Sequence, residues 1–209
     1  MEFLKMAAII VAAYLLGSLN SAIIVSRLML GVDIRNYGSG NAGSTNAFRT
    51  MGGKKALIVM GGDILKGVAA VAIGAWLAGD MGKLVAGVFV VVGHVFPLYF
   101  GFKGGKGVLT AATMIALIDW RVFLVIFAVF LLAFLLTRYV SLGSVLAAFT
   151  FPFAMWYFHR DAVMTAIAAV VGLGVIWLHR SNIGRIAHGT ESKLSFKQKP
   201  KATEKEHKK

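Results

Sequence analysis

A run of glycines and small polar residues over positions 38–46 has the residue types of an oxyanion-binding segment. It reads Gly-Ser-Gly-Asn-Ala-Gly-Ser-Thr-Asn, and Arg49 follows it. Glycines allow backbone N–H groups to approach an anion closely, and arginine adds a planar fork for phosphate or carboxylate. The other candidate contacts in this segment are Ser39, Gly40, Asn41, Ser44, Thr45 and Asn46. The run matches G-x-G-x-x-G, but apolar flanks exclude a βαβ dinucleotide site, and a plain polar loop is the alternative.

A second glycine-rich segment, Gly-Phe-Lys-Gly-Gly-Lys-Gly at 101–107, stands directly before an apolar stretch. It is not a P-loop, because Phe100 replaces the first glycine and Gly107 replaces the serine or threonine. A helix that begins near Gly107 would point its N-terminal N–H groups and its dipole at the loop. We therefore predict a phosphate site. The alternative is that the two lysines only reflect the general excess of basic residues in cytoplasmic loops of membrane proteins. The contacts of the predicted site are Gly104, Gly105, Lys106 and Gly107.

A third polar segment begins with His179 and runs to Glu191. His179 is a candidate general base or a donor to a phosphate oxygen, and a hydrogen-bonded spacer is the alternative role. Asn182 follows three residues later, on the same helix face if the helix continues. Ser144 is a further candidate ligand, or else a small residue of helix packing.

The composition indicates that membrane-spanning helices must position these segments. Of 209 residues, 58% are hydrophobic and 15% are charged, and the mean hydropathy is +0.76. A soluble domain could not bury so much apolar surface, so we expect a polytopic membrane protein. The chain has no cysteine, which excludes disulfides and thiolate metal sites. The spacing of its other residues suggests no metal site and no cofactor.

Seven apolar stretches predict an all-α bundle of about seven transmembrane helices. Most approach the roughly 20 residues that cross a bilayer, but 108–118 is short and fits a short or re-entrant helix. The stretches are 6–28, 55–78, 84–100, 108–118, 122–137, 140–158 and 162–179.

The distribution of lysine and arginine predicts an N-terminus outside and a C-terminus in the cytoplasm. One side of the bundle would hold 4 of the 22 basic residues and the other 17. The polar segments 35–54, 101–107, 138–144 and 179–191 all fall on the basic side. We expect an active site on that face and an integral-membrane domain at 1–192. The Lys-rich segment 193–209 would be a cytoplasmic tail near anionic lipid, without a nucleic-acid partner.

Polar residues inside the apolar stretches have mainly structural interpretations. Asp63 and Lys66 stand three apart and are expected to pair with each other. His94 is expected to bind a neighbouring helix, and Gly17 together with Asn20 indicates close helix packing.

Three segments together resemble the bacterial acyl-phosphate:glycerol-3-phosphate acyltransferases, the PlsY family. The resemblance extends from the first apolar stretch to Glu191. The matching segments are GSGNAGSTNAFRTMG at 38–52, GHVFPLYFGFKGGKGVLT at 93–110 and HRSNIGRIAHGTE at 179–191.

The resemblance implies essential roles for Ser39 and Arg49 and a glycerol 3-phosphate loop at Gly104–Gly107. It also makes His179 and Asn182 important for activity and Glu191 more structural. The implied reaction transfers a fatty acyl group from acyl-phosphate to the C1 hydroxyl of glycerol 3-phosphate, at the bacterial inner membrane.

Two questions stay open on the residues alone. The base is either His179 or an oxygen of a substrate phosphate, since the mixed-anhydride donor already has a good leaving group. A transporter of an organic phosphate would share the basic loops, but it should place its site near the membrane midplane.

Overall fold

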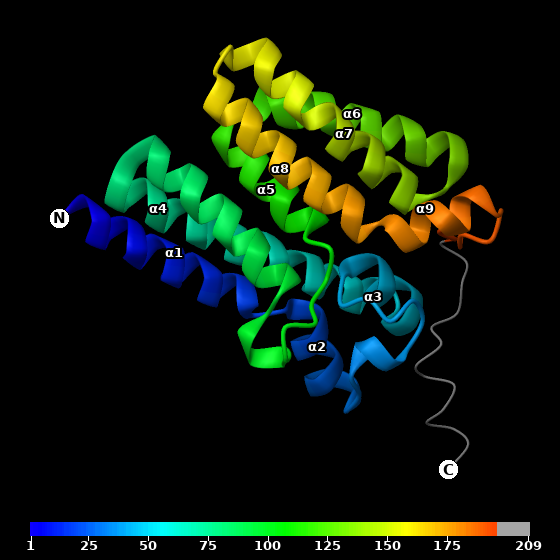
Figure 1. Cartoon of the computed structure of the whole chain (residues 1–209). Helices are drawn as coiled ribbons and strands as arrows, with labels where there is room; N and C mark the ends of the chain where they lie inside the picture. The colour runs from blue at the N-terminus through cyan, green and yellow to red at the C-terminus, as the bar shows by residue number, and fades with distance from the viewer. Residues whose placement is uncertain (196–209) are drawn as a thin grey trace. The chain divides into compact units, whose positions relative to one another are not determined.

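The computed structural model describes residues 1–195, and this part of the chain contains helices and no strand. It divides into two compact units, Met1–Ile118 and a second unit that begins at Asp119. Figure 1 shows the order of the helices along the chain. The all-helical expectation is confirmed. The predicted lysine tail lies outside the described residues from position 196 onward.

The first apolar stretch forms two helices, α1 (Glu2–Ser18) and α2 (Ser21–Leu30), in place of the single helix expected over 6–28. The helix is interrupted at Leu19 and Asn20, and the Asn20 side chain caps α2 by accepting from the Ile23 N–H at 3.2 Å. A side-chain acceptor at this position satisfies one of the unpaired N–H groups of a helix start. The break therefore has a local cause in the sequence.

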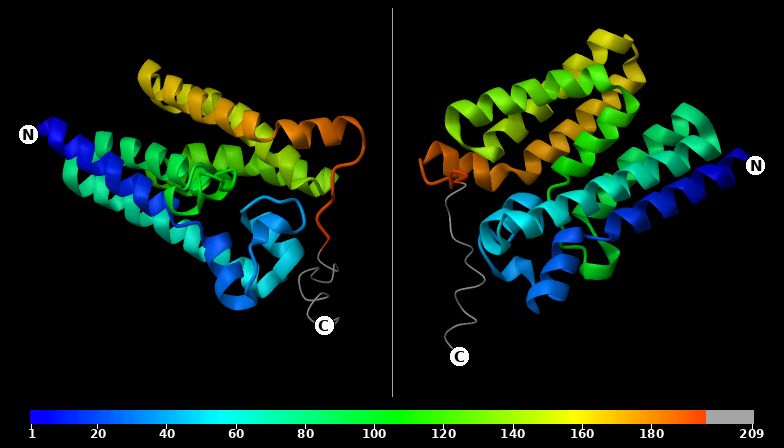
Figure 2. Two further views of the ribbon diagram at one scale, coloured as in Figure 1. Left: turned by 60° about the horizontal axis from the view of Figure 1, so that its bottom comes forward. Right: turned by 180° about the vertical axis from the view of Figure 1, so that it is seen from behind.

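The long helix α4 (Gly53–Val95) is two arms joined by a reversal at Ala78 and Gly79. α1 packs along α4, as Figures 1 and 2 show. The contact depends on glycines, since a Cβ on Gly17 would meet the Val90 backbone and one on Gly93 would meet that of Tyr14. Small residues allow helix backbones to approach closely in membranes, and the packing predicted from Gly17 and Asn20 is confirmed.

The polar segments of the first unit are partly helical. The 3₁₀ turn η1 (Ile34–Asn36) precedes the first glycine run, and residues 44–51 form α3 (Ser44–Met51) within the predicted polar segment 35–54. α4 is followed by η2 (Leu98–Phe100) and by the loop to α5 (Val108–Ile118). α5 begins directly after Gly107, as predicted.

The second unit contains α6 (Trp120–Thr137), α7 (Val140–His159), α8 (Ala162–Leu178) and the short α9 (Arg180–Ala187). α7 packs against both α6 and α8, and α9 contacts α7 and α8. Asp119 and Asp161 cap α6 and α8 with their side chains. The start of the predicted tail also belongs here, because the Leu194 N–H donates to the Arg138 carbonyl at 3.0 Å.

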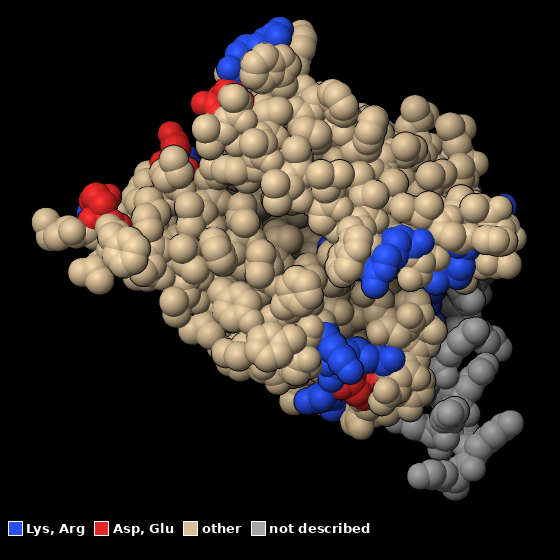
Figure 3. Space-filling model, in the orientation of Figure 1, with Lys and Arg blue, Asp and Glu red and all other residues tan. Residues whose placement is uncertain are grey.

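Four helical segments in the described residues are long and apolar enough to cross a membrane, or five if α8 and α9 form one bent span. This count takes α4 as one segment and leaves out the short α5, so the expected number of about seven remains a prediction. On the face in Figure 3, uncharged side chains cover the helices, and the charged ones gather near helix ends. Trp76 is 84% exposed, as expected of a side chain that meets lipid.

Candidate active site

The first glycine run is folded around the side chain of Asn46, which is 1% exposed. Its amide nitrogen lies 3.0 Å from the carbonyl oxygens of Tyr37 and Asn41 and 3.3 Å from that of Ile34. Its carbonyl oxygen accepts from the Ser39 N–H at 3.0 Å. Asn46 thus fixes the loop that presents the exposed Ser39.

Gly38 is required by this arrangement for two reasons. Its φ of +61° lies in the left-handed region, and a Cβ would meet the Asn46 side chain. Arg49 lies on α3, half-buried, in the last turn of the helix. Ser39 and Arg49 are therefore held by one short loop–helix unit.

The second glycine segment is tied to the end of α4. The N–H groups of Gly104 and Gly105 donate to the carbonyls of Val95 and His94, at 3.1 and 3.2 Å. These bonds satisfy acceptors that a helix C-terminus leaves unpaired. Lys106 is half-buried, and Gly107 at φ +70° leads into α5. The positive end of the α5 dipole therefore lies beside Lys106.

The two glycine segments pack directly against each other within the first unit. A Cβ on Gly105 would meet the His94 ring on one side and, at 2.5 Å, the Ala42 carbonyl on the other. Ala42 belongs to the first segment, and its carbonyl also accepts from the Asn20 amide at 3.3 Å. Segments about 60 residues apart in the sequence are thus in direct contact through two buried residues.

A buried group of charged side chains lies behind this contact. Lys66 Nζ is 2.8 Å from Asp63 Oδ1, 2.8 Å from His94 Nδ1 and 3.2 Å from the Leu19 carbonyl. The predicted pairing of Asp63 with Lys66 and the predicted contact of His94 with a neighbouring helix arm are confirmed. Lys66 therefore links the α1–α2 break to the helix end that carries the second glycine segment.

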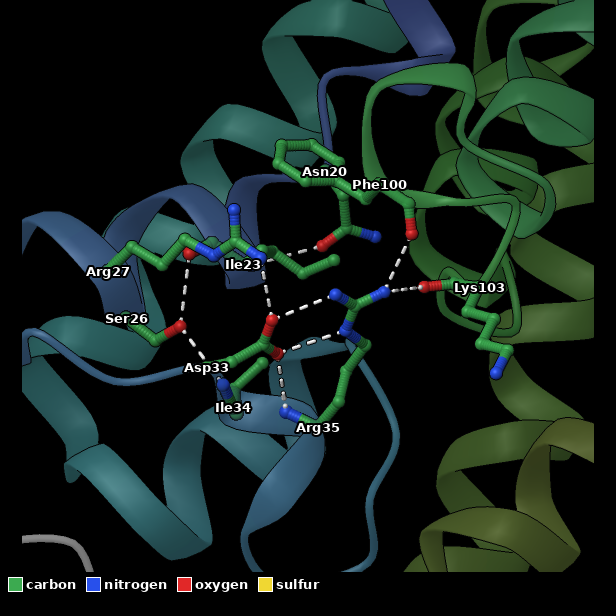
Figure 4. A network of polar contacts seen from close by, with 9 residues as sticks. All are labelled: Asn20, Ile23, Ser26, Arg27, Asp33, Ile34, Arg35, Phe100 and Lys103. Atoms are coloured by element: carbon green, nitrogen blue, oxygen red, sulfur yellow. Dashed lines mark hydrogen bonds and ion pairs between the residues drawn. The ribbon is translucent and has the colours of Figure 1, made fainter.

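The ion pair of Arg35 with Asp33 precedes the first glycine segment, and hydrogen bonds from Arg35 connect it to the second (Figure 4). Arg35 forms a two-point contact with the Asp33 carboxylate and also donates to the carbonyls of Phe100 and Lys103, at 2.8 and 3.0 Å. Hydrogen bonds from Arg35, and also from Arg27, hold the pKa of the Asp33 carboxyl well below its usual range. The carboxylate therefore stays ionised at neutral pH.

The third polar segment forms a corner in the second unit, centred on Glu191. Its carboxylate accepts from Ser141 Oγ at 2.7 Å, from the Asn182 amide at 2.6 Å and from Arg185 Nε at 2.7 Å. Burial raises the pKa of the Glu191 carboxyl, but these three hydrogen bonds outweigh it and set the pKa below its ordinary value. Glu191 therefore orients Asn182, in agreement with its predicted structural role.

His179 stands at the bend between α8 and α9, where the helix axes turn by 56°. Its Nδ1 lies 2.8 Å from the Val175 carbonyl, and the side chain is buried. The condition for a shared helix face of His179 and Asn182 is not met, because the helix ends at Leu178 and restarts at Arg180.

The sequence matches the glycerol-3-phosphate acyltransferase family over residues 7–189. The chain belongs to this family. Among relatives, the glycerol-3-phosphate acyltransferase of Chlorobaculum tepidum is 42% identical, over 92% of this chain and 97% of the relative. That of Bacillus subtilis is also 42% identical, over 91% and 98%.

Two solved structures of the acyltransferase PlsY share the fold. The glycerol 3-phosphate form of that integral membrane protein matches with a TM-score of 0.85 and 36% identity, over 91% of this chain and 96% of the other. Its lysophosphatidic acid form matches with a TM-score of 0.82 and 35% identity, over 92% and 97%. This chain is thus an integral membrane glycerol-3-phosphate acyltransferase, and the resemblance read from its motifs is confirmed.

The surroundings change the reasons for several predicted site residues of this acyltransferase. The Asn46 amide is occupied by backbone groups of the loop, so we assign it a positioning role and not direct substrate contact. The N–H groups of Gly104 and Gly105 donate to carbonyls of α4, so they are already engaged within the protein. Neither position has room for a Cβ, so both glycines are needed for the packing of the loop. Ser144 Oγ donates to the Val140 carbonyl at 2.9 Å within α7, which matches its alternative, structural interpretation.

The remaining candidates keep positions that suit a site. The first unit holds six residues of the two joined glycine segments, together with Arg49 on α3: Ser39, Gly40, Asn41, Thr45, Lys106 and Gly107. His179 and Asn182 belong to the second unit.

The sequence did not predict the roles of Arg35 and Ser141 in holding these segments, nor the contact of Lys66 with the Leu19 carbonyl. The charge distribution identifies Arg35 only as a cytoplasmic basic residue. The sequence Asp33-x-Arg35 shortly before a glycine run could have indicated an ion pair that anchors the loop. Ser141 donates to Glu191, which is 50 positions away, and Lys66 donates to the Leu19 carbonyl, which is 47 positions away. No spacing in the sequence shows such pairs.

Proposed function

We propose that this chain transfers a fatty acyl group from acyl-phosphate to the C1 hydroxyl of glycerol 3-phosphate. The hydroxyl oxygen attacks the acyl carbonyl carbon, a new ester bond forms, and the bond between that carbon and the phosphate oxygen breaks. Inorganic phosphate leaves, and lysophosphatidate is the product. The hydroxyl proton goes to His179 or to an oxygen of a substrate phosphate.

One observation carries the proposal: the two glycine segments adjoin through Gly105 and Ala42. The reaction requires two phosphate-bearing molecules side by side, and a cation stands at each segment: Arg49 on α3, just after the first, and Lys106 within the second. The mixed anhydride is already activated, so catalysis can rest on orientation and on neutralising the charge of the leaving phosphate.

The related structures support both ends of the reaction. PlsY has been solved in a glycerol 3-phosphate form and in a lysophosphatidic acid form, which match the proposed acceptor and product. We extend these ligands to the present chain because the fold, the motifs and most of both chain lengths agree.

We assign roles to residues as follows. Lys106 and the N-terminus of α5 bind the phosphate of glycerol 3-phosphate, and Gly107 permits the turn into the helix. Ser39 and Arg49 bind the phosphate and the acyl carbonyl of the acyl-phosphate donor at the first segment. His179 and Asn182 orient the glycerol 3-phosphate acceptor. Additional contacts come from the loop residues Gly40, Asn41 and Thr45.

We also propose that the enzyme lies in the bacterial inner membrane, with its active site at the cytoplasmic face and residues 1–192 forming the acyltransferase part. The support is the charge distribution, with 17 of 22 basic residues on the side that carries every glycine-rich segment. Glycerol 3-phosphate is charged and soluble, so access from the cytoplasm suits it.

The test is acyl transfer by purified protein in detergent or in vesicles. Palmitoyl-phosphate with glycerol 3-phosphate should yield lysophosphatidate and inorganic phosphate, whereas palmitoyl-CoA should serve poorly as donor. Equal rates with both donors would refute the donor assignment, and no transfer with either would refute the proposed function.

A flux measurement distinguishes the transporter alternative. Vesicles that contain the protein and an internal pool of labelled glycerol 3-phosphate should retain the label when no donor is present. Release of the label without acyl transfer would favour a transporter.

A further inference from the structure

Arg35 connects the approach to the first glycine segment with the start of the second. Its Nη1 donates to the Phe100 and Lys103 carbonyls, at 2.8 and 3.0 Å. Its Nε and Nη2 donate to the two oxygens of Asp33, at 2.9 and 2.8 Å. Figure 4 shows the guanidinium between the carboxylate and the loop. The planar guanidinium of Arg35 therefore holds the Asp33 carboxylate and the 101–107 loop in one fixed arrangement.

Both sides of this connection reach residues of the proposed site. On the first side, the Ile34 carbonyl next to Arg35 accepts from the Asn46 amide, which holds the Ser39 loop. On the other side, Lys103 stands three residues before Lys106, and Gly104 and Gly105 bind the end of α4. Arg35 therefore fixes the first half of the loop, and α4 fixes its centre.

The neighbouring Arg27 shows which part of the network matters. Arg27 also donates to Asp33 Oδ2 at 2.8 Å, and its guanidinium lies over the Phe100 ring, 5.5 Å from the ring centre, but within the described residues it donates to no loop carbonyl. Its side chain is 51% exposed, whereas that of Arg35 is 22% exposed. The two arginines share a carboxylate and both approach Phe100, but only Arg35 donates to the loop carbonyls, so Arg27 is a control for those two hydrogen bonds.

We propose that Arg35 is a positioning residue that sets the place of the 101–107 loop, and with it the reach of Lys106 toward the acceptor phosphate. The assignment of an acceptor phosphate rests on the proposed function. Lysine cannot replace Arg35, because an ammonium has no planar fork that serves a carboxylate and two carbonyls together.

The experiment compares Arg35→Lys, Arg35→Ala and Arg27→Ala in the full-length protein. With acyl-phosphate saturating, both Arg35 variants should raise KM for glycerol 3-phosphate about tenfold while kcat falls less than threefold. Arg27→Ala should stay within twofold of the unaltered protein on both constants. Hydrogen exchange of the backbone amides in 101–107 should accelerate at least tenfold in both Arg35 variants and stay unchanged in Arg27→Ala.

The outcomes separate the inference from the function on which it rests. An Arg35→Lys variant with unaltered KM and unaltered exchange would overturn the positioning role. If the unaltered protein transfers no acyl group, the proposed function fails, and the exchange contrast still tests the connection. If an Arg35 variant does not fold, Asp33→Asn provides the same test, since it weakens the anchor and leaves the guanidinium in place.

Discussion

Lys106 and Lys103 stand three residues apart in one loop, yet their surroundings differ. Lys103 is exposed, whereas Lys106 is half-buried next to the start of α5. A cation has a stronger effect on an anion where water is partly excluded and a helix dipole points the same way. The burial of Lys106 therefore makes it the better phosphate ligand of the two.

We expect Lys106→Ala to raise KM for glycerol 3-phosphate at least tenfold. A charge-assisted hydrogen bond contributes about 1.5–3 kcal/mol, which corresponds to a factor of roughly 10 or more. Steady-state acyl transfer at varied acceptor concentration measures the effect. Lys103→Ala should have a clearly smaller effect, and equal KM values for the two variants would contradict the assignment.

The ring of His179 has one defined hydrogen-bond partner in the backbone. Since the Val175 carbonyl can only accept, Nδ1 carries the proton of this hydrogen bond. A ring that only donates a hydrogen bond to a phosphate oxygen can be replaced by an amide N–H, whereas a base cannot.

We expect His179→Gln to keep at least a tenth of the activity and His179→Ala to lose about ten- to hundredfold in kcat/KM, as for a lost hydrogen bond to a charged group. The acyl-transfer rate of both variants, with their melting temperatures as a folding control, measures this. A folded His179→Gln protein that binds glycerol 3-phosphate but shows no turnover would assign the base to His179.

At the scale of elements, the site depends on the close contact between α1 and the second arm of α4. A Cβ on Gly93 would meet backbone atoms of α1, including the Ser18 nitrogen at 2.9 Å, and a backbone cannot move aside as a side chain can. α4 also ends two residues later, at Val95, where the second glycine segment is attached.

We therefore expect Gly93→Ala to destabilise the protein by about 1–3 kcal/mol, the usual cost of overpacking. Thermal unfolding of the purified protein in detergent measures the change. Gly61→Ala is the matched control on the same helix, since an added Cβ there would meet no atom within 4 Å. Equal melting temperatures for the two variants would show that the α1–α4 contact tolerates separation.

At the scale of the whole molecule, the absence of cysteine makes the orientation directly measurable. Any single introduced cysteine is the only thiol, so its labelling by a membrane-impermeant maleimide reports one position. Asp80, next to the reversal of α4, has an 87% exposed side chain, and Lys54 is exposed at the other end of the first arm.

We expect Asp80→Cys to be labelled in intact spheroplasts and Lys54→Cys only after the membrane is opened. Mass spectrometry of the labelled protein reads the result, and labelling of both variants in opened membranes is the control. The reverse pattern would place the glycine segments outside and contradict the proposed cytoplasmic active site.

Much of this protein follows from local properties of its sequence. Apolar length predicts α5 to α8 within about two residues, because a chain in lipid must satisfy its backbone hydrogen bonds within helices. The three polar segments identify the family, because their residue types are unusual between apolar stretches. Asn20 also shows why helix ends are harder to locate, since a capping side chain interrupts an otherwise apolar run.

Only the tertiary structure decided which of the polar and glycine residues hold the loops. The types of Asn46, Gly105 and Arg35 fit either substrate binding or support of a loop, and the choice depends on partners that the fold brings near. Asn46 meets carbonyls of its own loop, Gly105 fills the space between His94 and Ala42, and Arg35 reaches carbonyls 65 and 68 residues away. Composition and spacing determine the kinds of group available, whereas the packing of distant segments determines which of those groups are already engaged.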